Sequence, residues 1–401
     1  MLRYKLSRGR EKGQGPRRRG AAMAGRQRVP AMKVLLGAGT VALPVTRPGP
    51  DDVGDLKAEL IAAGRLSVPR ELLAGYRLSR STAGPGAGGA SIALGWTGPD
   101  GREHRLKLAV SRDGDAPLRL AKRPDGALEV LRRDGTVALA VVRLLPIAMH
   151  APDHCFINLE GDCVYDCAFC TATRPGSGEG RGAPRSPQRW VELIVASHRR
   201  RPFDGVAITS VDTADHEALM RDYEAVISGV VGALPGVVLG VEPPARSAED
   251  IERLHRAGAT ELKINIQTPD VDILARVCPG WDLERQCALL REGVRVFGRG
   301  RVTSNVIIGL GEADADVMRA LDRLAAAGVV PTLRVLRVSD LNRGKLESAL
   351  GRPLEPVAPA RHVRLARALG EALAHHGLSA RAFRTMCHSC MGCDLEPGVD
   401  I

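Results

Sequence analysis

The 401-residue chain is 44% hydrophobic but only 3% aromatic, and its formal net charge is +11. It is long enough for one large α/β domain with a smaller module, or for two domains of ordinary size. No run of about 18 apolar residues occurs, which argues against a membrane-spanning helix. The nine cysteines, an odd number in close spacings, favour metal ligation over disulfides, so we expect a cytoplasmic protein.

Most of the positive charge lies at the beginning of the chain. Residues 1–28 contain ten Lys and Arg against the single Glu11, which leaves the remainder nearly neutral. The segment lacks the series of interleaved aromatic residues that stack on bases, which argues against nucleic-acid binding. We expect residues 1–32 to form a disordered basic leader, with Met23 and Met32 as alternative start sites.

Residues 33–150 read as a small β-rich accessory module of unassigned role. One helical stretch covers 51–64, and hairpins are predicted around 98–101 and around Asp134-Gly135. The glycine-rich stretch 81–91 is expected to be a flexible connection.

Residues 151–345 alternate short apolar strands with longer helical patterns, several of which open with Ser or Asp and end in Gly. The predicted strands are 155–159, 205–210, 236–242, 261–267, 301–310 and 329–338. Six strand-then-helix units predict an α/β partial parallel barrel, with an open doubly wound sheet as the alternative. In either fold the chemistry belongs at the C-terminal ends of the strands.

Three cysteines, Cys163, Cys167 and Cys170, fall in the loop after the first predicted strand. Thiolates select zinc, copper(I) or iron–sulfur clusters. A structural zinc site normally has four ligands, usually in two distant pairs. Three thiols on one short loop fit three corners of a cubane cluster better, and they leave the fourth iron open; a zinc or adventitious cysteine site is the alternative.

The C-x3-C-x2-C spacing, with Phe169 directly before the last cysteine, resembles the signature loop of radical S-adenosylmethionine (SAM) enzymes. The resemblance implies a (β/α)6-type partial barrel and a [4Fe-4S] cluster whose open iron chelates SAM. Reductive cleavage of SAM then gives a 5′-deoxyadenosyl radical. It also implies a reductant such as ferredoxin or flavodoxin, and a substrate that is a small molecule or is bound to a carrier protein.

Three segments are similar to lipoyl and biotin synthases. They are "FINLEGDCVYDCAFCTATRPG" (156–176), "GVAITSVDTADH" (205–216) and "INIQTPDVDILARVCPGWDLERQCALLREG" (264–293). The chain departs from lipoyl synthase in two respects. No cysteine precedes Cys155, so the family's N-terminal cysteine trio is absent, and no Arg-Ser-Ser-Tyr segment follows the barrel.

The resemblance assigns roles to individual residues. The catalytic cluster would be held by Cys163, Cys167 and Cys170. Residues expected near the adenine are Phe169, Ile307, Gly309 and Glu312; those near the methionine end of SAM are Thr209, Ser210 and Asp212; Glu242 points into the same mouth, and Asn265 and Gln267 lie near the ribose.

A second trio, Cys387, Cys390 and Cys393, lies in the C-terminal segment 346–401, which also contains a predicted helix. Its spacing predicts an auxiliary [4Fe-4S] cluster, with a zinc site using His388 as the alternative. We expect this segment to fold back over a barrel mouth, so that its cluster faces the first one across the substrate. Cys155 and Cys278 are candidates for completing it.

The leading hypothesis is a radical SAM enzyme that abstracts hydrogen from an unactivated carbon, with sulfur insertion as in lipoyl and biotin synthases. Radical methylation, rearrangement or ligation is the alternative within the class, with the auxiliary cluster binding substrate or relaying electrons. Outside the class, the alternatives are a non-catalytic iron–sulfur scaffold or electron carrier and a zinc-stabilised nucleic-acid-binding module.

Overall fold

The computed structural model describes residues 53–111, 116–147, 150–159, 161, 163–173 and 186–401. The basic leader predicted for residues 1–32 lies outside this part. Within the described residues, no helix has the length and apolar character needed to cross a membrane.

The first sheet has seven strands in the order β2-β3-β4-β1-β5-β6-β7, and β3 also pairs with β7. Its strands are β1 (Arg65–Ser67), β2 (Ser79–Arg80), β3 (Ala90–Thr97), β4 (Glu103–Ser111), β5 (Leu118–Lys122), β6 (Leu128–Arg132) and β7 (Val137–Leu144). Helix α1 (Val53–Ala63) precedes it, and a short 3-10 helix (Arg70–Leu73) follows β1. The structure confirms both predicted hairpins, β3–β4 and β6–β7.

The glycine-rich stretch between β2 and β3 is an ordered, packed turn, so the prediction of a flexible connection was wrong. The N–H of Gly88 donates to the Ser81 carbonyl at 2.7 Å, and the Ser339 hydroxyl donates to the Ala87 carbonyl at 2.8 Å. Gly88 has φ +91°, and a Cβ there would lie 2.8 Å from the Thr171 hydroxyl. Glycine is therefore needed because the turn contacts the second sheet's loops closely, not because it moves.

The second sheet has six parallel strands in the order β13-β12-β11-β10-β9-β8. The strands are β8 (Cys155–Asn158), β9 (Gly205–Thr209), β10 (Val238–Glu242), β11 (Glu261–Lys263), β12 (Val302–Ile308) and β13 (Val329–Val335). Among the described residues no pairing joins β8 to β13, so the sheet is a partial barrel, as predicted. The fourth strand ends at Lys263, earlier than expected; beyond it the Ile266 N–H donates to the Ser304 hydroxyl at 3.1 Å, and the chain turns at Gln267, where φ is +66°.

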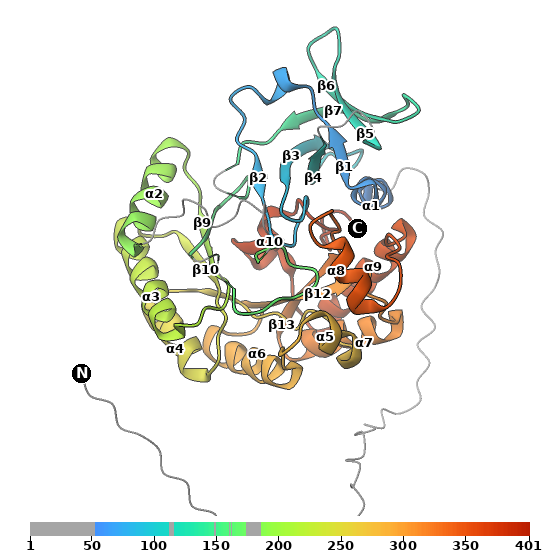
Figure 1. The fold of residues 1–401 in the computed structure, drawn as a ribbon. Helices are drawn as coiled ribbons and strands as arrows, with labels where there is room; N and C mark the ends of the chain where they lie inside the picture. Colours follow the sequence, from blue (N-terminus) through green and yellow to red (C-terminus); the bar gives the residue numbers. More distant parts are fainter. Residues whose placement is uncertain (1–52, 112–115, 148–149, 160, 162, 174–185) are drawn as a thin grey trace, which may run out of the picture. The chain divides into compact units, whose positions relative to one another are not determined.

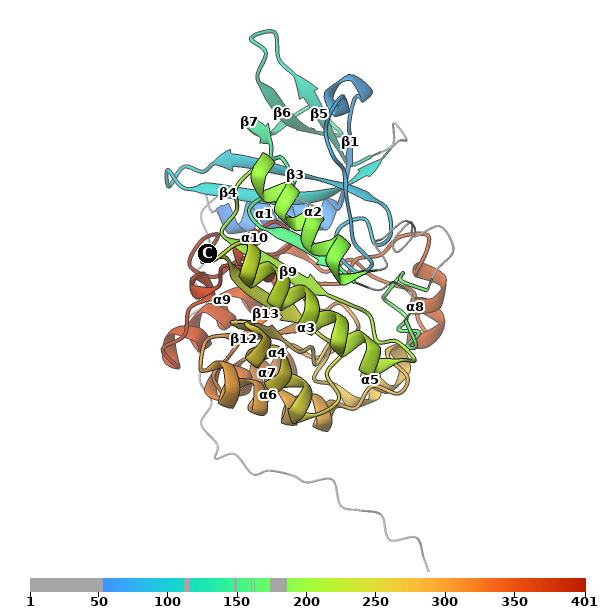
Figure 2. The same ribbon diagram turned by 90° about the vertical axis from the view of Figure 1, so that its left-hand side faces the viewer.

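Helices cover the outside of this sheet, as Figures 1 and 2 show for α2, α3 and α4. They are α2 (Pro187–Arg200), α3 (His216–Ala233), α4 (Ala248–Ala257), α5 (Val271–Val277), α6 (Leu283–Phe297), α7 (Asp314–Ala326), α8 (Arg343–Leu350) and α9 (Pro359–His375). Local signals set their ends: Ser186 caps α2, and Ser247 and Asp250 form a capping box at the start of α4. Gly258, in the left-handed region, ends α4.

The two sheets share one apolar core. Buried side chains of the first sheet, such as Leu94 and Leu106, belong to the same contact cluster as Val206 and Leu333 of the second. Helix α1 packs against α9 and adds Leu60 and other residues to this cluster. The first sheet is therefore fixed to the barrel by a continuous hydrophobic contact.

The C-terminal segment, with α10 (Met386–Cys390), lies inside the barrel, and Figure 1 shows α10 within the ring of helices. The Glu261 carboxylate, at the start of β11, accepts from the backbone N–H of Arg384 at 2.9 Å and of Thr385 at 3.1 Å. A Cβ on Gly205, the first residue of β9, would lie 2.5 Å from the Arg384 carbonyl oxygen. The segment therefore enters at the N-terminal ends of the strands.

This placement corrects the expectation that the segment folds back over the mouth of the barrel. The physical reason is that the inward positions of the strands provide both space and hydrogen-bond acceptors for it. Gly240 has no side chain, and a Cβ there would lie 2.0 Å from the Thr385 hydroxyl. The buried Glu261 carboxylate needs several donors, which the segment's backbone supplies.

Replacing Glu261 by Gln should destabilise the metal-free protein by about 2 kcal/mol, because a charged acceptor of two backbone N–H groups becomes a neutral amide that cannot accept at both atoms. Chemical denaturation measures the free energy of unfolding. The exposed Glu249, which pairs with Arg256 on the protein surface, is the matched control, and Glu249→Gln should change that free energy by less than about 0.5 kcal/mol. Equal effects of the two substitutions would contradict this account of the C-terminal segment.

Candidate functional site

Both cysteine trios line one cavity of about 700 Å³, a volume within the range of small-molecule sites. Most of the other residues predicted from the sequence line it too: Phe169, Thr209, Ser210, Asp212, Glu242, Asn265, Gln267 and Ile307. The structure therefore brings together residues that are spread over more than two hundred positions of the chain.

The loop with Cys163, Cys167 and Cys170 is held by backbone hydrogen bonds from three sides. Val164 N–H donates to the Asp212 carbonyl after β9 at 2.8 Å, and Ala168 N–H donates to the Val277 carbonyl at the end of α5 at 2.7 Å. The Asn342 side chain, just before α8, donates to the Phe169 carbonyl at 2.9 Å. These bonds fix the loop with its three thiols only partly buried.

The thiols of this loop differ in acidity. Burial raises the pKa of Cys163, and it raises the pKa of Cys170 to about 11. A hydrogen bond from the Cys278 thiol lowers the pKa of Cys167. Cys278 thus lies beside the first trio, which corrects its assignment as a candidate to complete the second cluster.

The donor set of the loop fits an iron–sulfur cluster better than a single ion. In the described part of the chain, no three His, Cys, Asp or Glu side chains are arranged to hold one metal ion. A cubane cluster requires less convergence, because each of its thiolate ligands binds a different iron atom. Burial keeps thiols of this loop protonated, and these protons would be released when a soft metal binds.

The second trio lies deeper in the barrel, next to positive charge. A guanidinium nitrogen of Arg334 lies 3.1 Å from the Cys387 sulfur, and the Lys263 ammonium lies 3.9 Å from it. Cys390 and Cys393 are buried and share a hydrogen bond, and the bond from Cys390 lowers the pKa of Cys393 to about 5. The thiolate, the form that binds metal, is thus stabilised at Cys393, while the same hydrogen bond raises the pKa of Cys390.

His388 does not face the cysteines. Its Nε2 lies 2.9 Å from the Thr303 hydroxyl, and its Nδ1 lies 2.9 Å from a carboxylate oxygen of Glu396. Both ring nitrogens are thus engaged, and His388 is not among the described residues that line the cavity. This arrangement counts against the zinc alternative, which needs His388 as a ligand.

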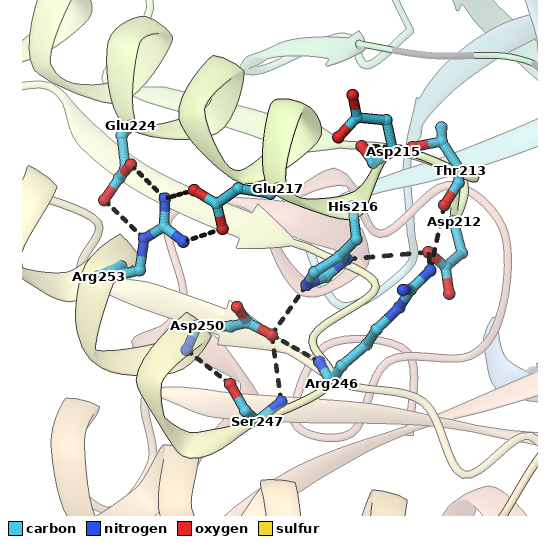
Figure 3. Close-up of polar contacts among 10 residues, drawn as sticks. All are labelled: Asp212, Thr213, Asp215, His216, Glu217, Glu224, Arg246, Ser247, Asp250 and Arg253. Atoms are coloured by element: carbon cyan, nitrogen blue, oxygen red, sulfur yellow. Dashed lines mark hydrogen bonds and ion pairs between the residues drawn. The ribbon is translucent and has the colours of Figure 1, made fainter.

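One residue that lines the cavity is a fixed carboxylate, Asp212. Figure 3 shows Arg246 reaching it, with a nitrogen–oxygen distance of 2.7 Å. His216 lies between Asp212 and Asp250, 3.0 Å from the Asp250 carboxylate, which also belongs to the capping box of α4. Asp212 is therefore held at the cavity edge by groups anchored on two helices.

Polar side chains at the ends of β10 and β11 form a hydrogen-bonded chain. The Asn265 amide donates to Glu242 at 2.7 Å, and its oxygen accepts from the backbone N–H of Asn305 at 3.0 Å. Among the described residues, no donor reaches the buried side-chain oxygen of Asn305, a residue that lines the cavity. An unsatisfied acceptor therefore lies at the wall of the cavity.

Gly309 and Glu312, predicted near the adenine, are not among the described residues that line the cavity. The Glu312 carboxylate accepts from the N–H groups of Gly309 and Leu310, both at 2.8 Å, and from Arg361 at 2.8 Å. Its oxygens are thus occupied in shaping the turn after β12.

The sequence interpretation missed two groups of cavity residues. One comes from the first sheet and its loops, including Arg77, Thr82 and His150; the Thr82 carbonyl accepts from the Thr171 N–H at 3.0 Å. No local signal marks this group. The other is Lys263 and Arg334, polar residues at inward positions of apolar strands, and that alternation was a usable signal.

Comparisons with known proteins agree with this site. Residues 157–324 match the model of the radical SAM superfamily. Lipoyl synthase of Oleidesulfovibrio alaskensis is 32% identical over 181 residues, covering 43% of this chain and 57% of that protein. Lipoyl synthase of Methanocella arvoryzae is 29% identical over 182 residues, covering 43% of this chain and 58% of that protein.

The chain therefore spans little more than half the length of the curated relatives it matches. Among solved structures, the FeFe-hydrogenase maturase HydG from Carboxydothermus hydrogenoformans aligns with 13% identity and a TM-score of 0.46. That alignment covers 61% of this chain and 58% of the other. A likeness at this level carries no functional argument.

Alkylation of the metal-free protein should separate the two trios. With its pKa lowered to about 5, Cys393 is a thiolate throughout pH 6–9, so its labelling by iodoacetamide should change less than about twofold. Labelling of Cys170, whose pKa is raised to about 11, should rise roughly tenfold per pH unit. Peptide mass spectrometry measures both.

The control for this prediction is Cys390→Ala, which removes the thiol that donates to Cys393. In that variant the pKa of Cys393 should rise and its labelling should become steeply pH-dependent. A steep dependence already in the unsubstituted protein would contradict the assigned charge state.

Proposed function

Because residues 157–324 make this chain a member of the radical SAM superfamily that resembles lipoyl synthase, we propose that it cleaves SAM reductively and abstracts hydrogen from an unactivated carbon. The substrate would lie between the two cysteine trios. The observation that carries the proposal is that both trios line a single cavity together with the polar strand-end residues.

The family implies a [4Fe-4S] cluster and SAM as cofactors. Cys163, Cys167 and Cys170 would hold the cluster, which supplies the electron for SAM cleavage and an open iron for its methionine end. The protein's own groups would orient SAM: Asp212 at the mouth, and the buried oxygen of Asn305 as an acceptor.

The apolar side of the cavity would shield the reaction. Phe169 and Ile307 are buried in one cluster with Leu310 and Ala168 beside the cysteine loop, and both line the cavity. They would keep other hydrogen donors away from the 5′-deoxyadenosyl radical, which must react with its substrate before it abstracts hydrogen elsewhere.

For the second trio we propose an auxiliary [4Fe-4S] cluster at Cys387, Cys390 and Cys393, with sulfur insertion as the reaction. The resemblance to lipoyl synthase supports this choice. Radical methylation, rearrangement or ligation is the second candidate. It is favoured by the position of the second trio, on a C-terminal segment that lies inside the barrel.

A radical SAM enzyme also requires a reductant and a substrate. We propose ferredoxin or flavodoxin as the electron donor, and a small molecule or a carrier-bound acyl group as the substrate. The cations at the cavity, including Arg77 and Arg334, would suit a substrate with a negatively charged or polar end.

Anaerobic reconstitution of two triple variants tests the proposal. Wild type should bind about eight iron atoms, and the Cys163/Cys167/Cys170→Ala and Cys387/Cys390/Cys393→Ala variants about four each. With dithionite, 5′-deoxyadenosine should form from SAM in wild type and in the second variant, but not in the first. The second variant is the matched control, because it also loses three cysteines.

Two results would contradict the proposal. Binding of zinc in place of iron would instead indicate a zinc-stabilised module. Iron without any SAM cleavage would favour a non-catalytic iron–sulfur scaffold.

A further inference from the structure

The first sheet and helix α1 hold the turn that carries the second cysteine trio. The backbone N–H of Lys107, on β4, donates to the Gly392 carbonyl at 2.6 Å. The Lys57 ammonium, on α1, donates to the Met391 carbonyl at 2.7 Å, and Arg105 donates to the Ser389 carbonyl at 3.3 Å. Three carbonyls of one short turn are thus bound by residues more than 280 positions earlier in the chain.

These bonds stabilise a backbone that is unfavourable by itself. Met386 and Met391, which flank the helical turn of Cys387 and Cys390, have φ +61° and +53°, in the left-handed region. A side chain other than Asn or Asp rarely adopts this conformation unless surrounding contacts impose it. At Met391 these contacts come from the first sheet and α1, whereas the residue before Met386, Thr385, is held by Glu261 of β11.

The Lys107 side chain is also buried against the turn that carries the cysteines. Only 1% of the residue is exposed, and a Cβ on Gly392 would lie 2.9 Å from its Cγ. Its ammonium contacts three neutral acceptors: the Ser79 hydroxyl at 3.0 Å, the His150 carbonyl at 3.0 Å and the His150 Nε2 at 3.3 Å. Among the described residues, no carboxylate forms an ion pair with it.

The other cations around the turn are nearly all balanced. Lys57 pairs with Asp400, Arg105 with Asp153, and Lys263 with Glu242. Arg334 and Arg337 share the one carboxylate of Asp394. Lys107 differs from these cations because the described residues supply no carboxylate partner for it, and a buried charge without a counterion is costly.

We propose that the first sheet is part of the binding site of the C-terminal iron–sulfur cluster, with Lys107 as the counterion of the anionic cluster ligated by Cys387, Cys390 and Cys393. Lys107 is a positioning residue: it fixes the turn through its backbone N–H and compensates the ligands' charge through its ammonium. This inference rests on the proposed function of the second trio, and it assigns a role to a module that has none otherwise.

The test uses the Cys163/Cys167/Cys170→Ala chain as parent, because only the C-terminal cluster can form in it. Lys107→Gln removes the charge and keeps a polar group that can reach Ser79. Lys107→Arg keeps the charge. Lys122→Gln is the matched control, since Lys122 is exposed on β5 of the same sheet.

After identical anaerobic reconstitution, Lys107→Gln should retain at most half of the parent's iron and sulfide. The cluster that does form should be reduced at a more negative midpoint potential in an EPR-monitored titration, because loss of a nearby cation disfavours the more negative, reduced state. Lys122→Gln should match the parent, and Lys107→Arg should recover the potential. A purely structural role would lower iron content without shifting the potential.

A Lys107→Gln chain that loads iron and titrates like the parent would overturn the inference. If Lys107→Gln shows no cooperative thermal transition, Gly392→Ala is tested in its place, because its Cβ displaces the Lys107 stem without removing a charge. Parent-like iron content and midpoint potential in Gly392→Ala would also overturn the inference. A parent chain that binds no iron is a different result, since it refutes the proposed C-terminal cluster itself.

Discussion

The cavity depends on one constraint: polar groups buried inside the barrel must find partners there. The strands place Glu261, Thr303 and Lys263 at inward positions. The C-terminal segment supplies their partners through two backbone N–H groups, the His388 ring and the Cys387 thiol. Each buried polar group of the strands thus has a hydrogen-bond partner in the C-terminal segment, and this segment forms one wall of the cavity.

This arrangement sets the geometry between the two cysteine trios. The first trio lies on a loop at the C-terminal end of β8, held by bonds from β9, α5 and the start of α8. The second trio lies on the C-terminal segment inside the barrel, so the two trios line the same cavity from different elements.

The first sheet contacts both the apolar core of the barrel and the loops of the functional site. It shares its apolar core with the barrel, its glycine-rich turn bonds to Thr171 just after the first trio, and its β4 bonds to the turn of the second trio. One module thus contacts the surroundings of both trios. Because hydrophobic burial fixes it rigidly, the hydrogen bonds of Lys57, Arg105 and Lys107 act with little loss of conformational freedom.

The six parallel strands, the two hairpins and the loop of Cys163, Cys167 and Cys170 could be predicted from the sequence, since they depend on local periodicity, turn residues and spacing. The sequence could not determine how the strands' inward polar residues would be used, or that Cys278 lies beside Cys167 rather than the second trio. Nor did it indicate Lys107, whose contact with Gly392 joins residues 285 positions apart. Such contacts follow from the packing of two sheets and a C-terminal segment in three dimensions. Only the tertiary structure decided them, because no short stretch of sequence contains both partners.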